Sequence, residues 1–174
     1  GHVQGVSDMN LLAAWTNEQF DPRLSWEDVR WVKQQWGGKL ILKGIMDVED
    51  AKLAVAAGAD AIVVSNHGGR QLDGAPSSIS ALPAIVDAVG TQTEVWMDGG
   101  IRSGQDVLKA WALGARGTMI GRAMAYSLGA AGEAGVTKAL QILHKELDVT
   151  MAFCGHTNIQ TVDRNILLPG TLPG

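Results

Sequence analysis

The sequence is poor in several features that define large classes of proteins. A single cysteine, Cys154, excludes a disulfide framework and fits a reducing compartment. No apolar run reaches the ~18 residues of a transmembrane helix, and no charged segment followed by an apolar one indicates a signal peptide. There is no basic block and the net charge is −4, which argues against nucleic-acid binding. No group of Cys, His and carboxylate residues has metal-ligand spacing, so we predict no metal site.

Caps and glycines divide the chain into alternating strands and helices. Ser25, Asp47 and Ser103 each have an aspartate three residues later and precede an apolar periodic segment, as is typical of a helix N-terminus. Short apolar runs between these helices predict buried strands. The predicted strands span 39–44, 61–65, 94–97 and 117–120, and the predicted helices span 25–37, 47–58, 77–90, 103–114, 123–128 and 133–153.

This alternation predicts an α/β fold with parallel strands joined by right-handed crossovers. The reactive residues all follow strands, where both a (β/α)8 TIM barrel and an open doubly wound sheet bind ligands. Glycine-rich loops at 98–102 and 121–123 follow the last two strands, and barrels often bind phosphate at this place. Because a barrel needs eight strands, we predict the C-terminal half of a TIM barrel, strands 5–8, with C-terminal helices.

The half-barrel interpretation divides the chain into three parts. We expect 1–24 to be a mobile loop region after strand 4, 25–165 to be the half barrel with the binding and catalytic residues, and 166–174 to be an extended C-terminal arm. The chain begins with Gly1 rather than methionine, so we expect a fragment or a processed piece of a longer protein.

A reactive stretch at 65–74 follows the second predicted strand. His67 is the best candidate for a general base, because imidazole titrates near neutral pH; the alternative is a structural histidine. Arg70 can bind a carboxylate through two hydrogen bonds, although it could instead form a salt bridge with Asp73. Ser65 either donates to a ligand or caps the turn.

The other strand ends carry residues suited to a phosphorylated ligand. Lys43 could stabilise negative charge on a cofactor or form a Schiff base with a substrate. Asp98 could accept a hydrogen bond from a ribityl or ribose hydroxyl. Arginines and glycines in the two loops could hold phosphate, although the arginines could also be solvated surface residues. These phosphate candidates are Arg102, Arg122, Gly99, Gly100 and Gly121.

Four segments carry a resemblance to a known family: 42–44 (Leu-Lys-Gly), 65–73 (Ser-Asn-His-Gly-Gly-Arg-Gln-Leu-Asp), 98–104 (Asp-Gly-Gly-Ile-Arg-Ser-Gly) and 120–122 (Ile-Gly-Arg). In their order and spacing they resemble the FMN-dependent L-α-hydroxy-acid oxidases and dehydrogenases. That family includes glycolate and lactate oxidases, mandelate dehydrogenase and the flavocytochrome lactate dehydrogenases. The match runs from about Ser25 to the end of the chain, and the Ser-Asn-His-Gly-Gly-Arg-Gln element is its most specific part.

The resemblance implies a role for each candidate residue. His67 would contact the substrate and act as the base that takes its proton, and Arg70 would bind its carboxylate. Lys43 would lie near the N1/C2 carbonyl edge of the flavin and stabilise the reduced, anionic form. Ser65 would contact FMN. The ribityl and phosphate ligands would be Asp98, Gly99, Gly100 and Arg102, with Gly121 and Arg122 closing the phosphate site.

The implied reaction is the FMN-dependent oxidation of a small (S)-2-hydroxy acid, with L-lactate as the leading substrate ahead of glycolate and mandelate. The family's first four strands, including an aspartate that pairs with the base, are absent from this chain. We therefore expect activity only with a companion N-terminal half-barrel chain, and a complete enzyme that is a homo-oligomer, a tetramer. We expect a cytoplasmic location, with peripheral attachment at the inner face of the membrane as an option.

Two other functions stay open at this stage. A flavin-dependent isomerase on an FMN-binding barrel would share the phosphate loops but would not need the pair of His67 and Arg70. A non-catalytic half barrel could serve as an assembly or phosphate-binding module, and it would be stable without flavin.

Overall fold

A four-stranded parallel sheet forms the centre of the molecule. The computed structural model describes residues 14–15, 18 and 21–170. Its strands are β1 (Ile41–Ile45), β2 (Ala61–Val64), β3 (Glu94–Met97) and β4 (Gly117–Thr118), and they lie in the order β1-β2-β3-β4. Each neighbouring pair is parallel, so each connection is a crossover. The predicted α/β fold is therefore confirmed.

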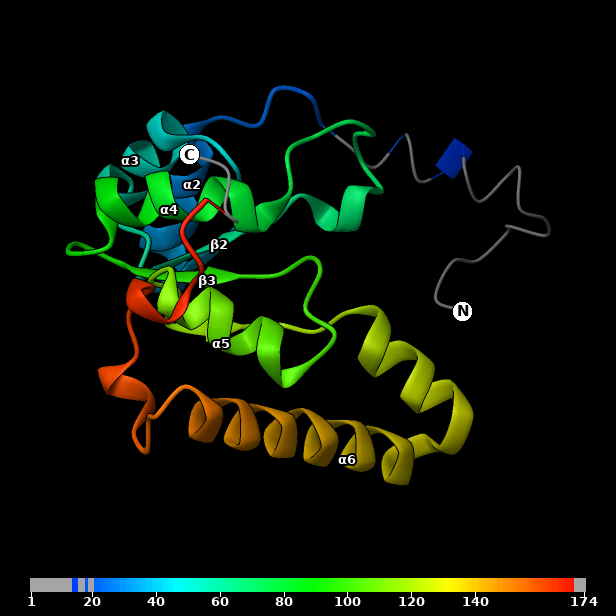
Figure 1. Ribbon diagram of the computed structural model, residues 1–174. Helices are drawn as coiled ribbons and strands as arrows, with labels where there is room; N and C mark the ends of the chain where they lie inside the picture. The colour runs from blue at the N-terminus through cyan, green and yellow to red at the C-terminus, as the bar shows by residue number, and fades with distance from the viewer. Residues whose placement is uncertain (1–13, 16–17, 19–20, 171–174) are drawn as a thin grey trace.

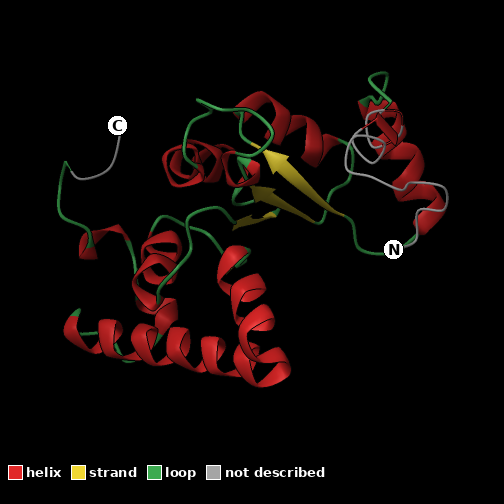
Figure 2. Ribbon diagram, turned by 90° about the vertical axis from the view of Figure 1, so that its right-hand side faces the viewer, coloured by secondary structure: helices red, strands yellow, loops and turns green. Residues whose placement is uncertain are grey.

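Helices supply these crossovers and flank the sheet. α2 (Trp26–Trp36) precedes β1, and α3 (Val48–Ala56), α4 (Ser78–Val89) and α5 (Gly104–Ala112) follow β1, β2 and β3 in turn. α6 (Arg122–Phe153) follows β4 and packs on the outside of α5, which lies between it and β3 in Figure 1. Figure 2 shows the strands at the centre with helices around them. The chain also forms short 3₁₀ helices, which are η1 (His67–Gly69), η2 (Ile159–Thr161) and η3 (Arg164–Ile166).

The helix starts follow the predicted caps. The Asp28 carboxylate accepts from the backbone N–H of Ser25 at 2.7 Å, and Asp47 accepts from the N–H of Glu49 at 2.8 Å. Ser103 begins α5 in the same way. α6 departs from helical geometry at Ala131 and Gly132, so its two parts correspond to the two helices predicted there.

The two faces of the sheet have different surroundings. Alternate residues, such as Ile62, Val95 and Met97, belong to the main hydrophobic core, which also includes Leu82 and Ile85 of α4. The residues between them point the other way, because side chains alternate along a strand. One such row, in register across the four strands, is Lys43, Val63, Trp96 and Gly117. Parallel sheets usually have both faces covered, or close into a barrel.

The last strand is shorter than the sequence predicted. β4 ends at Thr118 instead of residue 120. The Met119 N–H still donates to the Met97 carbonyl at 3.0 Å, so strand-like pairing continues for one more residue before the chain turns at Gly121. Near the C-terminus, Leu167 packs against the core. Most of the predicted loop region 1–24 and residues 171–174 of the predicted arm lie outside the described residues.

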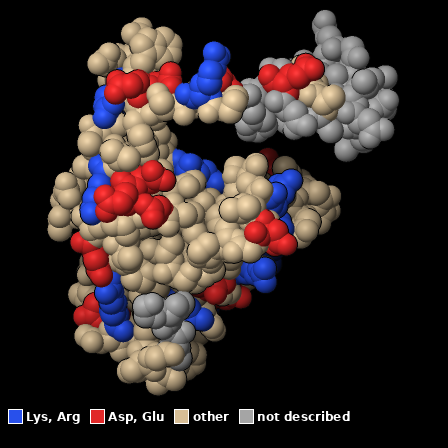
Figure 3. Space-filling model, turned by 90° about the horizontal axis from the view of Figure 1, so that it is seen from above, with Lys and Arg blue, Asp and Glu red and all other residues tan. Residues whose placement is uncertain are grey.

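Charged side chains of both signs lie near one another on the surface. On the face in Figure 3 they are found mainly toward the edges, around a broad uncharged area. Pairs such as Arg30 with Glu27 and Lys52 with Glu49 are exposed, and pairs of this kind contribute little stability. Within the described part of the chain, no helix is long and apolar enough to span a bilayer.

Candidate active site

A cavity of about 360 Å³ lies at the carboxyl ends of the strands. All of the predicted site residues except Ser65 line it, although they come from four separate strand ends. Its lining consists of Lys43, His67, Gly68, Arg70, Asp98, Gly99, Gly100, Ile101, Arg102, Met119, Gly121, Arg122, Ala123 and Ala125. The predicted site had not included Gly68, Ile101, Met119, Ala123 and Ala125, since glycine and apolar side chains beside a motif carry no chemical signal of their own.

Lys43 connects three of the strand ends. Its Nζ lies 2.8 Å from Asp98 Oδ2 and donates to Ser65 Oγ at 2.9 Å. The Asp98 side chain is 18% exposed and that of Lys43 is 38% exposed. The ammonium group is thus held on the cavity wall by a charge and a hydroxyl, which leaves part of it open to a ligand.

Asp98 has an unused acceptor. Among the described residues, its Oδ1 is buried and has no hydrogen-bond partner, whereas its Oδ2 pairs with Lys43. A buried polar atom without a partner is costly. Because Asp98 lines the cavity, a ligand hydroxyl entering there could donate to this oxygen.

The turn after β2 directs His67 and Arg70 to the cavity. His67 adopts φ 57°, a left-handed conformation that is uncommon for a residue other than glycine, and Gly68 and Gly69 continue it at φ 69° and 70°. Ser65 Oγ accepts from the His67 N–H at 3.2 Å, and Asn66 Oδ1 accepts from the Gly68 N–H at 3.0 Å. Arg70 lines the cavity, and the structure has no ion pair between Arg70 and the neighbouring Asp73, both of which are described.

The N-terminus of α5 is already occupied by protein carboxylates. Asp106 Oδ2 accepts from the N–H groups of Arg102 and Ser103, each at 3.0 Å. Glu146 of α6 accepts from the Gly104 N–H at 2.9 Å. A Cβ atom at Gly104 would lie 2.0 Å from the Leu147 nitrogen, so the two helices require glycine at this crossing. These backbone donors are therefore not free for an anion.

The N-terminus of α6 differs, because no side chain caps it. Its N-cap is Gly121, and Gly121, Arg122 and Ala123 all line the cavity. The first N–H groups of a helix lack intrahelical acceptors and favour an anion. Arg122 Nη2 also donates to the Gly68 carbonyl at 3.4 Å, which brings this loop to the turn that carries His67 and Arg70. An anion in the cavity could thus contact α6 and two arginines.

The charged groups and the volume of the cavity suit a phosphorylated ligand that also carries hydroxyl groups. The lining contains four cationic side chains, Lys43, Arg70, Arg102 and Arg122, and one carboxylate, that of Asp98. Gly100 adopts φ 91°, and a Cβ atom there would meet nothing within 4 Å, so its backbone is open to close approach. Within residues 14–15, 18 and 21–170, no three His, Cys, Asp or Glu side chains are arranged to hold a metal ion.

Comparisons with known proteins identify the family to which the chain is related. The sequence pattern of the family described as FMN-dependent dehydrogenase matches residues 2–169. An L-lactate dehydrogenase of Caulobacter vibrioides (strain NA1000 / CB15N) is 51% identical over 167 residues, which cover 96% of this chain and 43% of that protein. An L-lactate dehydrogenase of Pseudomonas syringae pv. syringae (strain B728a) is 51% identical over 88% of this chain and 40% of its own length.

Solved structures show the same relationship in three dimensions. A monotopic membrane protein, (S)-mandelate dehydrogenase, superposes with a TM-score of 0.85 at 39% identity, over 94% of this chain and 43% of that one. A mandelate oxidase variant with a monooxide FMN adduct gives a TM-score of 0.79 at 49% identity, over 84% and 46% of the two chains. The chain spans less than half the length of these relatives. Over that span, its sequence and its fold place it in the FMN-dependent dehydrogenase family.

Proposed function

We propose that this chain forms the FMN-binding and catalytic part of an enzyme that oxidises a small (S)-2-hydroxy acid to the 2-oxo acid, with L-lactate as the first candidate substrate. The observation that carries the proposal is one cavity lined by an imidazole, a guanidinium and an uncapped helix N-terminus with further arginines beside it. His67 and Arg70 come from one turn, and the anion site comes from α6. The L-lactate dehydrogenases among the relatives support the choice of substrate.

The residues of the cavity fit FMN. Asp98 Oδ1 is a buried acceptor that a ribityl hydroxyl would satisfy. Arg102, Arg122 and the backbone of Gly121 would hold the phosphate, with Gly99 and Gly100 allowing close approach. Lys43 would lie beside the flavin and stabilise negative charge on it. FMN, when bound, would supply the chemistry that accepts electrons from the substrate.

The substrate would be held and deprotonated by groups of this chain. The Arg70 guanidinium would bind the carboxylate and fix the position of the 2-carbon, because two parallel hydrogen bonds restrict orientation. The His67 imidazole would take the proton of the 2-hydroxyl as a general base. These side chains share a short turn, so the positions of the imidazole and the guanidinium are fixed relative to each other.

A substrate panel tests the proposal. The natively purified protein is mixed with L-lactate, glycolate or (S)-mandelate and an artificial electron acceptor, and the 2-oxo acid is measured. We expect turnover of these (S)-2-hydroxy acids, with L-lactate preferred. Turnover of none of them by flavin-containing protein would favour an isomerase, and stable protein without flavin would favour a non-catalytic module.

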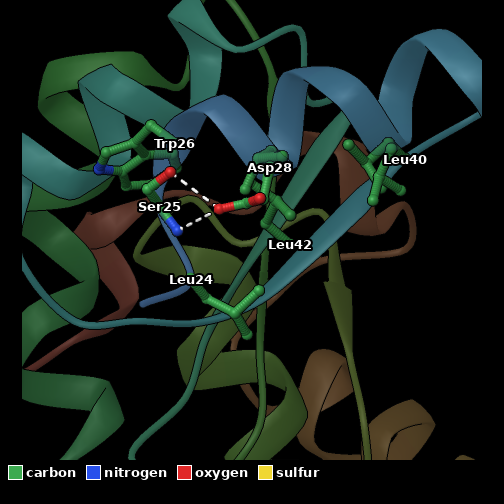
Figure 4. Close-up of a pocket in the computed structure, with 8 residues that line it drawn as sticks. Leu24, Ser25, Trp26, Asp28, Leu40 and Leu42 are labelled. Atoms are coloured by element: carbon green, nitrogen blue, oxygen red, sulfur yellow. Dashed lines mark hydrogen bonds between the residues drawn. The ribbon is translucent and has the colours of Figure 1, made fainter. Parts of the chain in front are cut away.

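We further propose that the active form requires a companion N-terminal half-barrel chain, and the β1 edge of the sheet supports this. An apolar pocket of about 460 Å³ lies beside β1 and α2, and Figure 4 shows Leu24, Leu40 and Leu42 on its walls. No residue of α2 is fully buried. A helix in a crossover unit packs on both strands that it connects. Within the described chain, α2 has only one such strand, β1, and the edge of β1 opposite β2 is unpaired. A parallel strand of the companion would fill this place.

Light-scattering mass measurement tests the companion. The chain is combined with the part of the Caulobacter vibrioides relative that it does not match, and a one-to-one complex is expected. Val32→Asp, in the apolar pocket, should weaken the complex at least about tenfold, since it buries an unpaired charge. Leu140→Asp, on the exposed side of α6, is the matched control and should have no effect. A cooperatively folded 18.4 kDa monomer that ignores the companion contradicts the idea.

Assembly and location complete the proposal. We expect the complete enzyme to be a homotetramer, and the mass of the native protein checks this. Peripheral attachment to the membrane of a cytoplasmic protein is supported by the monotopic (S)-mandelate dehydrogenase among the related structures. Co-sedimentation with lipid vesicles tests it, and protein that stays in the supernatant at low salt contradicts it.

A further inference from the structure

Ser65 lies beneath the cavity instead of in its wall. It follows β2, is 3% exposed and is absent from the cavity lining, unlike every other predicted site residue. The resemblance to hydroxy-acid oxidases had implied that Ser65 contacts FMN. Its contacts indicate a further role, one that acts through its neighbours.

A single oxygen of Ser65 joins the two sides of the site. Ser65 Oγ accepts from Lys43 Nζ at 2.9 Å and from the backbone N–H of His67 at 3.2 Å. A hydroxyl oxygen has two acceptor lone pairs, so these donors use both. Lys43 lies on β1, on the proposed flavin side, and His67 lies on the turn after β2, on the proposed substrate side. The hydroxyl thus fixes the distance between them.

The bond to His67 holds a backbone that needs support. His67 has φ 57°, and this left-handed region is unfavourable for residues with a Cβ atom. The turn is held by two side chains, since Ser65 takes the N–H of His67 and Asn66 takes the N–H of Gly68. If the first bond is lost, the His67 backbone can relax and carry its imidazole away from the cavity.

We propose that Ser65 is a positioning residue that fixes the Lys43 ammonium and the turn of His67 relative to each other. Its effect on catalysis rests on the proposed function, whereas its effect on the turn does not. Its hydroxyl fixes the positions of the His67 imidazole and the Lys43 ammonium group.

Ser78 provides a matched control. It is 1% exposed, and its Oγ accepts from the backbone N–H of Asn66 at 3.1 Å. Ser78→Ala therefore removes a buried hydroxyl that bonds a backbone amide one residue away from His67, but it does not touch Lys43 or His67. Any general effect of losing a buried hydroxyl should appear equally in both alanine variants.

Hydrogen exchange at single amides tests the positioning of the turn in natively purified protein. In Ser65→Ala, the His67 amide should exchange about three to ten times faster, the effect of one lost hydrogen bond. Ser65→Thr keeps the hydroxyl and should restore slow exchange. Ser78→Ala should accelerate the Asn66 amide and leave that of His67 unchanged. Equal acceleration of the His67 amide in both alanine variants, or in neither, overturns the proposal.

Kinetics test the consequence for the reaction. Ser65→Ala should lower kcat about 10- to 100-fold, because a small misplacement of a reacting group is costly, and should change KM less than about threefold, because Arg70 is not bonded to Ser65. Ser78→Ala should keep kcat within about twofold, and Ser65→Thr should recover most of it. Unchanged kcat in Ser65→Ala overturns the positioning role. If the wild type oxidises no 2-hydroxy acid, the proposed function fails, and the exchange data still decide the role of Ser65.

Discussion

The two ends of the sheet each carry a lysine–aspartate pair, but only one pair is complete. At the amino end, Asp60 receives hydrogen bonds on both oxygens, from Lys39 at 2.8 Å, from the Leu40 N–H at 2.9 Å and from Lys33. At the carboxyl end, Asp98 Oδ2 pairs with Lys43, whereas Asp98 Oδ1 is buried with no partner in the described structure.

We interpret the difference as that between a structural contact and the proposed binding site. Asp60 connects α2, the start of β1 and the start of β2, and its contacts leave no acceptor unused. Side-chain hydrogen bonds from Lys33 and Lys39 hold the pKa of Asp60 well below its usual value. Asp98 lines a cavity, and its Oδ1 has no hydrogen-bond partner among the described residues. We therefore expect changes at the carboxyl end to affect function, and changes at the amino end to affect stability.

The largest expected effect is at His67. His67→Gln should slow flavin reduction by a 2-hydroxy acid about 10²- to 10⁴-fold, the usual contribution of a general base, with little change in melting temperature. Stopped-flow absorbance measures the rate. His144→Gln, on the exposed surface of α6, is the control and should behave like the wild type. Near-normal reduction in His67→Gln would remove His67 from the role of base.

The next largest effect should be the loss of cofactor from an Asp98 variant. Asp98→Ala removes both the partner of Lys43 and the unused acceptor, so the Kd for FMN should rise about 10- to 100-fold, as for hydrogen bonds to charged groups. Fluorescence titration of the apoprotein measures this. Asp60→Ala should leave the Kd unchanged. If Asp60→Ala and Asp98→Ala weakened FMN binding equally, the proposed difference between the two ends of the sheet would be wrong.

A smaller effect on stability is expected at the amino end. Asp60→Asn keeps an acceptor for the Leu40 N–H but loses the charge that pairs with Lys33 and Lys39. The melting temperature should fall by a few degrees, as measured by circular dichroism, while FMN binding stays at the wild-type level. Asp87→Asn, which breaks the exposed pair with Arg164, is the control and should change the melting temperature less.

The smallest effect is the pH dependence of that stability. The pKa of Asp60 is lowered on folding from its ordinary value of 3.8, so the folded state favours its ionised form. Its contribution is fully present above pH 4 and falls as the pH drops toward the lower folded-state pKa. The difference in melting temperature between wild type and Asp60→Asn should therefore be constant near neutrality and shrink below about pH 4. A difference that grows with acidity would contradict the assignment.

Much of the fold was readable from local sequence signals. Helix starts at Ser25, Asp47 and Ser103 depend on hydrogen bonds over two or three residues, and the residue types that form such bonds can be recognised in the sequence. Apart from β4, which ends at Thr118 instead of residue 120, the strand ends were broadly predictable for a similar reason, because glycines and charged residues interrupt short apolar runs. Their meeting in one cavity followed from parallel pairing, which brings the carboxyl ends of strands to one edge.

Contacts between residues far apart in the chain could not be predicted from the sequence. The bond from the Gly104 N–H to Glu146 spans 42 residues, and it helps to fill the N-terminus of α5. The depth of Ser65 depends on the way β2 packs between β1 and β3, so the sequence could not show that it lies beneath the cavity. The unused oxygen of Asp98 likewise appears only once Lys43 is placed on its other side.

The proposed oxidation of a 2-hydroxy acid by bound FMN can be tested by an anaerobic titration of the native protein with L-lactate. The visible absorption bands of the flavin are followed during the titration. We expect that the protein carries flavin, that L-lactate bleaches the bands of about one flavin per site, and that His67→Gln retains flavin whose bands bleach far more slowly. Bands that persist with every (S)-2-hydroxy acid, or native protein without flavin, would contradict the account.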